Sequence, residues 1–211
     1  MSIARKVMAG SGRITLVDSV VEATKTGGPD ITTMPVGFEA GDLGVWLFSS
    51  AGTDVITPVP AMTTIKVQAS SGLQLAAYAF IMDGTETGIT TTGPTITASA
   101  SVFAVFRGAS LPSASDVTSI TGGSGMPDPP AANAGSARDW ILACGGLNNT
   151  NMIATAQAGY SLIGALGETR LFEDSSVMMS SKTGTAAADN PGVFGGAGSS
   201  NWIGFSLRIS P

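Results

Sequence analysis

Carboxylates are the residues of this chain that could carry acid–base chemistry, because it has no histidine and a single cysteine. Without histidine, neither a Ser–His–Asp triad nor a Cys–His nucleophile can form. Glycosidases use two carboxyl groups about 5–10 Å apart. Glu39 and Asp42 flank a turn, and Glu168 and Asp174 frame an expected strand, but neither pair alternates along a central strand. We therefore predict no catalytic residues and no enzymatic activity.

Metal binding is the second chemistry that carboxylates serve. Zinc sites need combinations of cysteine and histidine that this composition excludes. The segment Asp83-Gly84-Thr85-Glu86 brings two carboxylates together, but Ca²⁺ takes about six to eight oxygen ligands. An aspartate at the first position of a β-turn explains this segment without a metal. No glycine-rich phosphate loop precedes a helix, so we predict neither a metal site nor a cofactor.

Sugar binding is a third candidate chemistry. Asn148, Asn149 and Asn151 lie in an expected loop, where they could contact a glycan. Trp202 lies beside glycine and serine on the polar face of the last expected strand. Its indole ring could stack on a sugar, or it could pack in the core or against a neighbouring chain. Packing is the preferred interpretation, and these four residues are the predicted ligand-binding candidates.

Composition restricts the class of function further. Charged residues make up only 12% of the chain, against about 25% in an ordinary domain. The net charge of −5 argues against nucleic-acid binding, which needs a basic surface. No apolar run approaches the length of a membrane helix, and no apolar stretch follows the basic pair Arg5-Lys6 as in a signal peptide. We expect no membrane insertion, and synthesis in a cytoplasm.

Alternation of apolar and polar residues with a period of two predicts antiparallel strands. In the last segment, 202–209, one face is apolar and the other mostly polar, which is typical of a half-buried strand. Segment 65–69 alternates in the same way, and Ile65, Val67 and Ala69 are predicted to face inward.

Other segments are apolar on both faces and predict central strands. They include Trp46, Trp140 and Cys144 as expected core residues, with the thiol acting as a small buried hydrophobe. These central segments are 43–48, 75–82, 102–106 and 140–144. Weaker strands are expected at 13–17, 94–99, 168–173 and 175–182, and 19–25 could be a strand or a helical turn.

Short strands separated by turn residues predict an all-β fold, an antiparallel two-sheet β-sandwich of the jelly-roll type with roughly ten to twelve strands. We expect an N-terminal arm at 1–12 and a single sandwich domain at 13–211. Residues 108–136 are rich in Ser, Gly, Pro and Ala and are expected to form a long loop crossing the sandwich. No repeat of fixed period is evident.

An ordered set of segments resembles the β-sandwich modules of tailed-bacteriophage virion structural proteins, of the minor tail, fibre or head-decoration kind. These segments are 41–48, 83–86, 101–108, 139–143, 158–161 and 202–209. The resemblance implies a concanavalin A-like sandwich without shared catalytic residues. The chain departs from the pattern at 58–62, where Pro58-Val59-Pro60-Ala61-Met62 replaces the expected Gly-Trp.

The resemblance implies a non-enzymatic virion component of the tail, fibre or head, made in the host cytoplasm and assembled as a homo-oligomer. Its expected partners are copies of itself and other virion proteins. Low charge fits this role, because it reduces repulsion between identical subunits. The alternative is a carbohydrate-binding adhesin or receptor-binding module for host attachment, whose partner would be a host-surface glycan.

Overall fold

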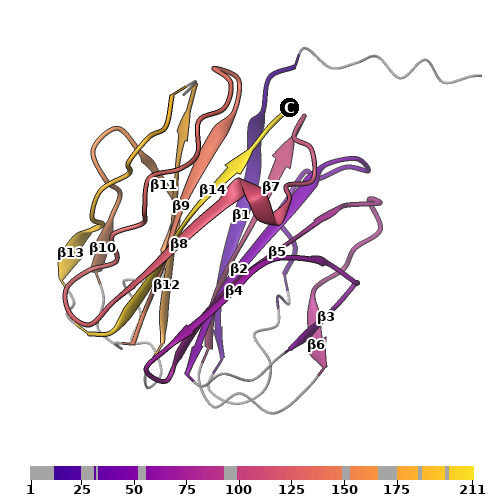
Figure 1. Ribbon diagram of the computed structural model, residues 1–211. Helices are drawn as coiled ribbons and strands as arrows, with labels where there is room; N and C mark the ends of the chain where they lie inside the picture. Colours follow the sequence, from indigo (N-terminus) through magenta and orange to yellow (C-terminus); the bar gives the residue numbers. More distant parts are fainter. Residues whose placement is uncertain are drawn as a thin grey trace, which may run out of the picture.

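Two five-stranded antiparallel sheets pack face to face in the computed structural model (Figure 1). The structure describes residues 12–24, 31, 33–51, 56–92, 99–148, 153–165, 175–184, 187–197 and 200–211. Within these ranges it contains fourteen strands and one short 3-10 helix, η1 (Ala114–Asp116). The predicted all-β sandwich is confirmed, with more strands than the predicted ten to twelve.

The first half of the chain forms one sheet and the second half forms the other. The first sheet has the order β1-β7-β2-β5-β4, with β1 at Thr15–Thr24, β2 at Leu43–Ala51, β4 at Thr63–Ser70, β5 at Leu73–Ile81 and β7 at Ser99–Arg107. The second has the order β11-β12-β9-β14-β8, with β8 at Val117–Gly122, β9 at Trp140–Leu147, β11 at Ser161–Ala165, β12 at Ser176–Thr183 and β14 at Trp202–Ile209.

Two small ribbons contain four of the strands that the sequence did not predict; β8 and β11 are the others. β3 (Thr57–Val59) pairs with β6 (Thr90–Thr92), and β10 (Ile153–Thr155) pairs with β13 (Gly195–Ala197). Each strand has three residues, too few to display a period of two. The predicted strand at 168–173 and most of 94–99 lie outside the described residues.

The two halves have the same strand topology. In each half the first strand lies at one edge of the sheet, the second in the centre and the fourth at the other edge. The fifth and seventh strands lie between these three: β5 and β7 in the first half, and β12 and β14 in the second. The third and sixth strands form the small ribbon, β3 with β6 and β10 with β13. The fold is therefore a seven-stranded module present twice, a duplication that no repeat of fixed period in the sequence indicated.

Local irregularities repeat as well. β4 bulges at Ile65 and β11 bulges at Ile163, at equivalent places in the pairing with β5 and β12. An isolated bridge joins Ile31 to Ile89 in the first half. The second half has its counterpart between Ala132 and Asp189. Bulges and bridges at matching positions show that the two modules share local backbone geometry as well as strand order.

The modules pack in an isologous manner, each using the same surface. Central strands β2 and β9 face each other, β5 lies against β14, and its equivalent β12 lies against β7. Because each module forms one whole sheet, the chain passes between the large sheets once, at 108–116. This order corrects the predicted jelly-roll subtype, in which successive strands belong to different sheets.

The main core lies between the sheets. Leu75 of the first sheet and Phe205 of the second belong to one cluster of buried side chains, and Cys144 is buried there as predicted. Ser49 and Ser175 share a hydrogen bond of 2.7 Å between their hydroxyl oxygens across the two halves. A single core that both modules supply explains why the two sheets form one sandwich.

Loops cover the outer face of each sheet and bury further clusters. Over the first sheet, Trp46, Phe48 and Tyr78 form an aromatic cluster with centroid separations of 5.2–6.0 Å. Over the second, the predicted crossing segment lies on β14: an added Cβ at Gly204 would come within 2.9 Å of Pro129. All residues of β14 are therefore buried, and the predicted half-buried strand is wrong on its polar face.

The bulge in β4 reverses part of the predicted alternation. Ile65 is buried as expected. The extra residue shifts the following ones by one position, so Val67 and Ala69 are exposed and Lys66 is half-buried. A one-residue shift exchanges the two faces of a strand.

Candidate functional site

The predicted asparagine candidates do not form a site among the described residues. Asn148 is half-buried at the end of β9, and its backbone N–H donates a hydrogen bond of 3.0 Å to the Asn201 carbonyl. Asn149 and Asn151 lie outside the described residues, as do Glu168 and Asp174.

Trp202 belongs to the buried cluster under the loops of the second sheet. Its side chain is 8% exposed, and its indole N–H donates a hydrogen bond of 3.0 Å to the Ser124 carbonyl. The ring lies so close to Gly122 that an added Cβ there would come within 2.3 Å of it. Packing is therefore its role, and stacking on a sugar does not fit this geometry.

Asp42 is the centre of an ion-pair motif in the first module. Its carboxylate accepts hydrogen bonds from Arg107 at 3.0 and 2.9 Å and from the Glu39 backbone N–H at 2.8 Å. Arg107 also donates to the Gly37 carbonyl and lies 3.5 Å from the Glu39 carboxylate. The predicted Glu39–Asp42 pair thus shares an arginine, and Asp42 ties a loop to the sheet.

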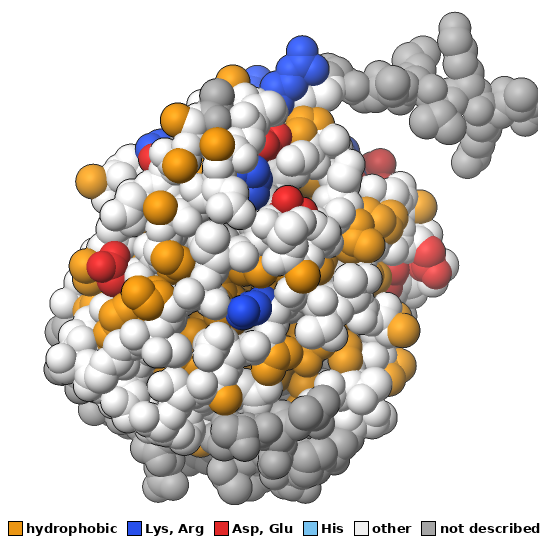
Figure 2. All heavy atoms as spheres, viewed as in Figure 1, with side chains coloured by type: hydrophobic (Ala, Val, Ile, Leu, Met, Phe, Trp, Pro, Cys, Tyr) orange, Lys and Arg blue, Asp and Glu red, His pale blue; other side chains and the backbone are white. Residues whose placement is uncertain are grey.

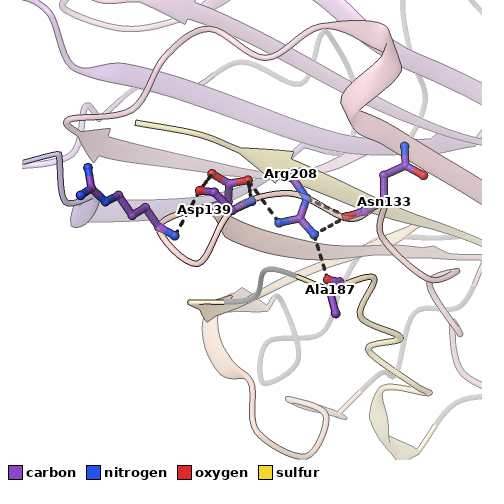
Figure 3. Close-up of polar contacts among 6 residues, drawn as sticks. Asn133, Asp139, Ala187 and Arg208 are labelled. Atoms are coloured by element: carbon purple, nitrogen blue, oxygen red, sulfur yellow. Dashed lines mark hydrogen bonds and ion pairs between the residues drawn. The ribbon is translucent and has the colours of Figure 1, made fainter.

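Asp139 occupies the equivalent place in the second module (Figure 3). It accepts a hydrogen bond of 2.8 Å from the Ser136 backbone N–H, as Asp42 does from Glu39, and pairs with Arg208 at 3.3 Å. Arg208 also donates to the carbonyls of Asn133 and Ala187. The repeated motif fastens the loop before the central strand of each module to its last strand.

The two motifs differ in exposure. Both aspartates are buried, at 4% exposed for Asp42 and 5% for Asp139, but the Arg107 side chain is 43% exposed whereas Arg208 is 4% exposed. Burial opposes ionisation of Asp139, but hydrogen bonds from Ser136 and the charge of Arg208 outweigh it and hold its pKa below the ordinary value. Asp139 and Arg208 therefore form a buried, charged pair.

The carboxylates of the 83–86 segment are held by local hydrogen bonds. Asp83 Oδ1 accepts from the backbone N–H and the hydroxyl of Thr85 at 2.8 and 2.6 Å. Glu86 accepts from the backbone N–H groups of Asp83 and Gly84. Hydrogen bonds from Thr85 lower the pKa of Asp83. The turn interpretation accounts for both carboxylates.

A third charged cluster joins Tyr160, Asp189 and Lys182 near the loops of the second sheet. Asp189 accepts hydrogen bonds from the Tyr160 hydroxyl at 2.5 Å and from Lys182 at 2.8 Å. Burial and the neighbouring carboxylate raise the pKa of Tyr160. The Lys182 ammonium lies 5.6 Å from the Tyr160 ring centroid, a cation–π distance. Each polar group has a partner within the cluster, which is a structural arrangement.

A surface groove lies beside this cluster, where the start of β9 meets the end of β12. It consists of two hollows, of about 290 and 340 Å³, which meet at Trp140 and Thr183. Arg13 and Arg138 line the first hollow, and Leu162 and Lys182 line the second. Trp140 is half-buried, not fully buried in the core as predicted. The sequence did not predict the groove, because its residues are scattered along the chain.

Within the described ranges, no group of three or more His, Cys, Asp or Glu residues could hold a metal ion, and no helix is long and apolar enough to cross a membrane. No protein-family model, curated protein or solved structure matches this chain.

Proposed function

We propose that this protein is a non-enzymatic structural subunit of a tailed-bacteriophage virion, in the tail, fibre or head decoration, and that it assembles as a homo-oligomer. The observation that supports this most is the repeated ion-pair motif. In both modules it uses charged side chains to fasten a loop onto a sheet rather than to line a cleft.

The surface supports the same role. In Figure 2 most of the visible surface is white or orange, and positive and negative side chains appear as isolated patches. Some large apolar side chains are exposed, among them Val36, Ile81 and Val193. A neutral surface of this kind permits close packing of many identical copies, because like-charge repulsion is small.

The mass of the purified full-length protein in solution tests this proposal. Light scattering at two concentrations should give one discrete multiple of the 21.1 kDa chain, such as a trimer, pentamer or hexamer, at both concentrations. A monomer at both concentrations would contradict self-assembly.

Carbohydrate binding is the second candidate function. The residues first predicted for it do not support it, because Trp202 is buried. The groove at Trp140 favours it instead, since it combines a partly accessible indole ring with hydroxyl and cationic side chains.

A further inference from the structure

The groove has a rigid apolar floor. Trp140 packs edge-on against Phe106, with ring centroids 5.8 Å apart and ring planes at 76°. This contact fixes the indole while part of it lines both hollows. Leu162, which is 44% exposed, adds a second apolar contact in the same groove. A fixed aromatic ring next to an exposed aliphatic side chain matches the apolar face of a sugar ring.

Hydroxyl groups line the same groove. Ser161, Ser181 and Thr183 border it within the second hollow, and Thr183 reaches into the first. A hydroxyl can both donate and accept a hydrogen bond. This alternation of apolar and hydroxyl groups suits a saccharide better than a purely apolar ligand.

Two arginines at one end of the groove add positive charge. Arg13 and Arg138 are exposed, and the Arg138 guanidinium lies 3.1 Å from the Cβ position of Gly12, next to Arg13. Among the described residues no ion pair joins either arginine to a carboxylate, because the neighbouring Asp139 is buried against Arg208. Guanidinium groups bind carboxylates through paired hydrogen bonds.

The first module provides an internal comparison. In the strand register, Trp140, Lys182 and Thr183 correspond to Leu43, Phe80 and Ile81 of the first module. There Leu43 is fully buried and the aligned position of Arg138 is Gly41. The second module thus has an indole and cations where the first has apolar residues and glycine. Because both modules have the same fold, the fold itself does not require an indole and cations at these positions.

We propose that this groove, lined by Arg13, Arg138, Trp140 and Thr183, binds an acidic saccharide, in which a sugar ring contacts Trp140 and its carboxylate contacts the two arginines. This inference does not depend on self-assembly. The probe is trigalacturonic acid, titrated into the full-length protein by calorimetry and by tryptophan fluorescence. Trp46 and Trp202 are buried, so a fluorescence change reports mainly on Trp140.

Binding of trigalacturonic acid is expected, with no binding of neutral maltotriose. Arg138→Gln should weaken the affinity about ten-fold or more, since a charge-assisted hydrogen bond contributes about 1.5–3 kcal/mol. Arg13→Gln combined with Arg138→Gln should abolish it. Lys66→Gln is the matched control, because it removes one positive charge from the other sheet, and it should leave the affinity unchanged.

Three results would overturn the proposal: no binding of the acidic trisaccharide, equal weakening by Lys66→Gln, or equally tight binding of inorganic phosphate. The last would mean that the arginines recognise charge alone. Because Arg13 and Arg138 are exposed, their variants should unfold at the same urea concentration as the parent, which separates lost binding from lost structure. Light scattering on the same samples shows whether assembly is independent of the groove.

Discussion

Replacing Arg208 by methionine is expected to lower the free energy of unfolding by about 3–5 kcal/mol, because it leaves the Asp139 carboxylate buried without its counter-charge. The same replacement of Arg107 should cost less, because that side chain is 43% exposed and water already screens its ion pair in part, although Asp42 itself is 4% exposed. The two arginines lie on equivalent strands but two register positions apart, since Arg107 aligns with Ser210 and Arg208 with Val105. The two variants therefore compare an exposed and a buried arginine, each paired with a buried aspartate.

Urea unfolding of the two variants measures this difference. The double variant Asp139→Asn with Arg208→Met should recover part of the lost stability, because it removes the unpaired charge as well. Equal losses in Arg107→Met and Arg208→Met would contradict the assignment of Arg208 as the buried partner.

Trp202→Ala is expected to lower the free energy of unfolding by about 3–5 kcal/mol, the usual cost of removing a buried aromatic side chain. The indole fills the space between Gly122 and the loops of the second sheet. Trp202→Phe keeps an aromatic ring there and should cost less, in part the roughly 0.5–1.5 kcal/mol of the hydrogen bond to Ser124.

The same urea titration applies to the tryptophan variants, with loss of fluorescence from Trp46 and Trp140 as the signal. If Trp202→Ala changed the stability by less than about 1 kcal/mol, as for an exposed side chain, then Trp202 would be available to a ligand after all, and its place in the core would be wrong.

Much of the fold follows from the sequence, because the pattern of apolar residues along a strand depends on which of its two faces are buried. The doubly apolar runs around Trp46, Val102 and Cys144 became central strands, since both faces of each sheet are covered. The Pro- and Gly-rich stretch before Asp139 was expected to cross the sandwich, and Pro127 and Pro129 do lie over Gly145 and Gly204. It also contains β8, which its weak alternation did not indicate.

Other features could not be predicted because they depend on contacts between distant segments. Trp202 was ambiguous in a polar context, and only the loop carrying Ser124 determines that it is buried. The bulge at Ile65 changes the face of Val67 without a local sequence signal.

The repeat was hidden for the same reason. The two modules share register and bulge positions rather than residue identity; Asp42 and Asp139 are among the few matching side chains. The groove likewise brings together Arg13, Arg138 and Leu162, which are far apart in the sequence.

A pair of circular permutants tests the duplicated architecture. Both join Pro211 to Met1, so that residues 1–12 bridge the ends. Residues 13 and 210, the positions that this segment has to connect, both lie beside segment 108–110. The Ser110 backbone N–H donates a hydrogen bond of 2.7 Å to the Ser210 carbonyl, and Gly108 lies against the Arg13 carbonyl. One permutant opens between Ser110 and Leu111, between the modules, and the other between Ser71 and Gly72, inside the first module.

The measurement is the free energy of unfolding of both permutants in urea. If each seven-stranded module is one structural unit, opening between modules only exchanges their order, and that permutant should unfold in one transition and be the more stable of the two. If the permutant opened between the modules were the less stable, or failed to fold while the other folded, the sandwich would not be built from two equivalent units.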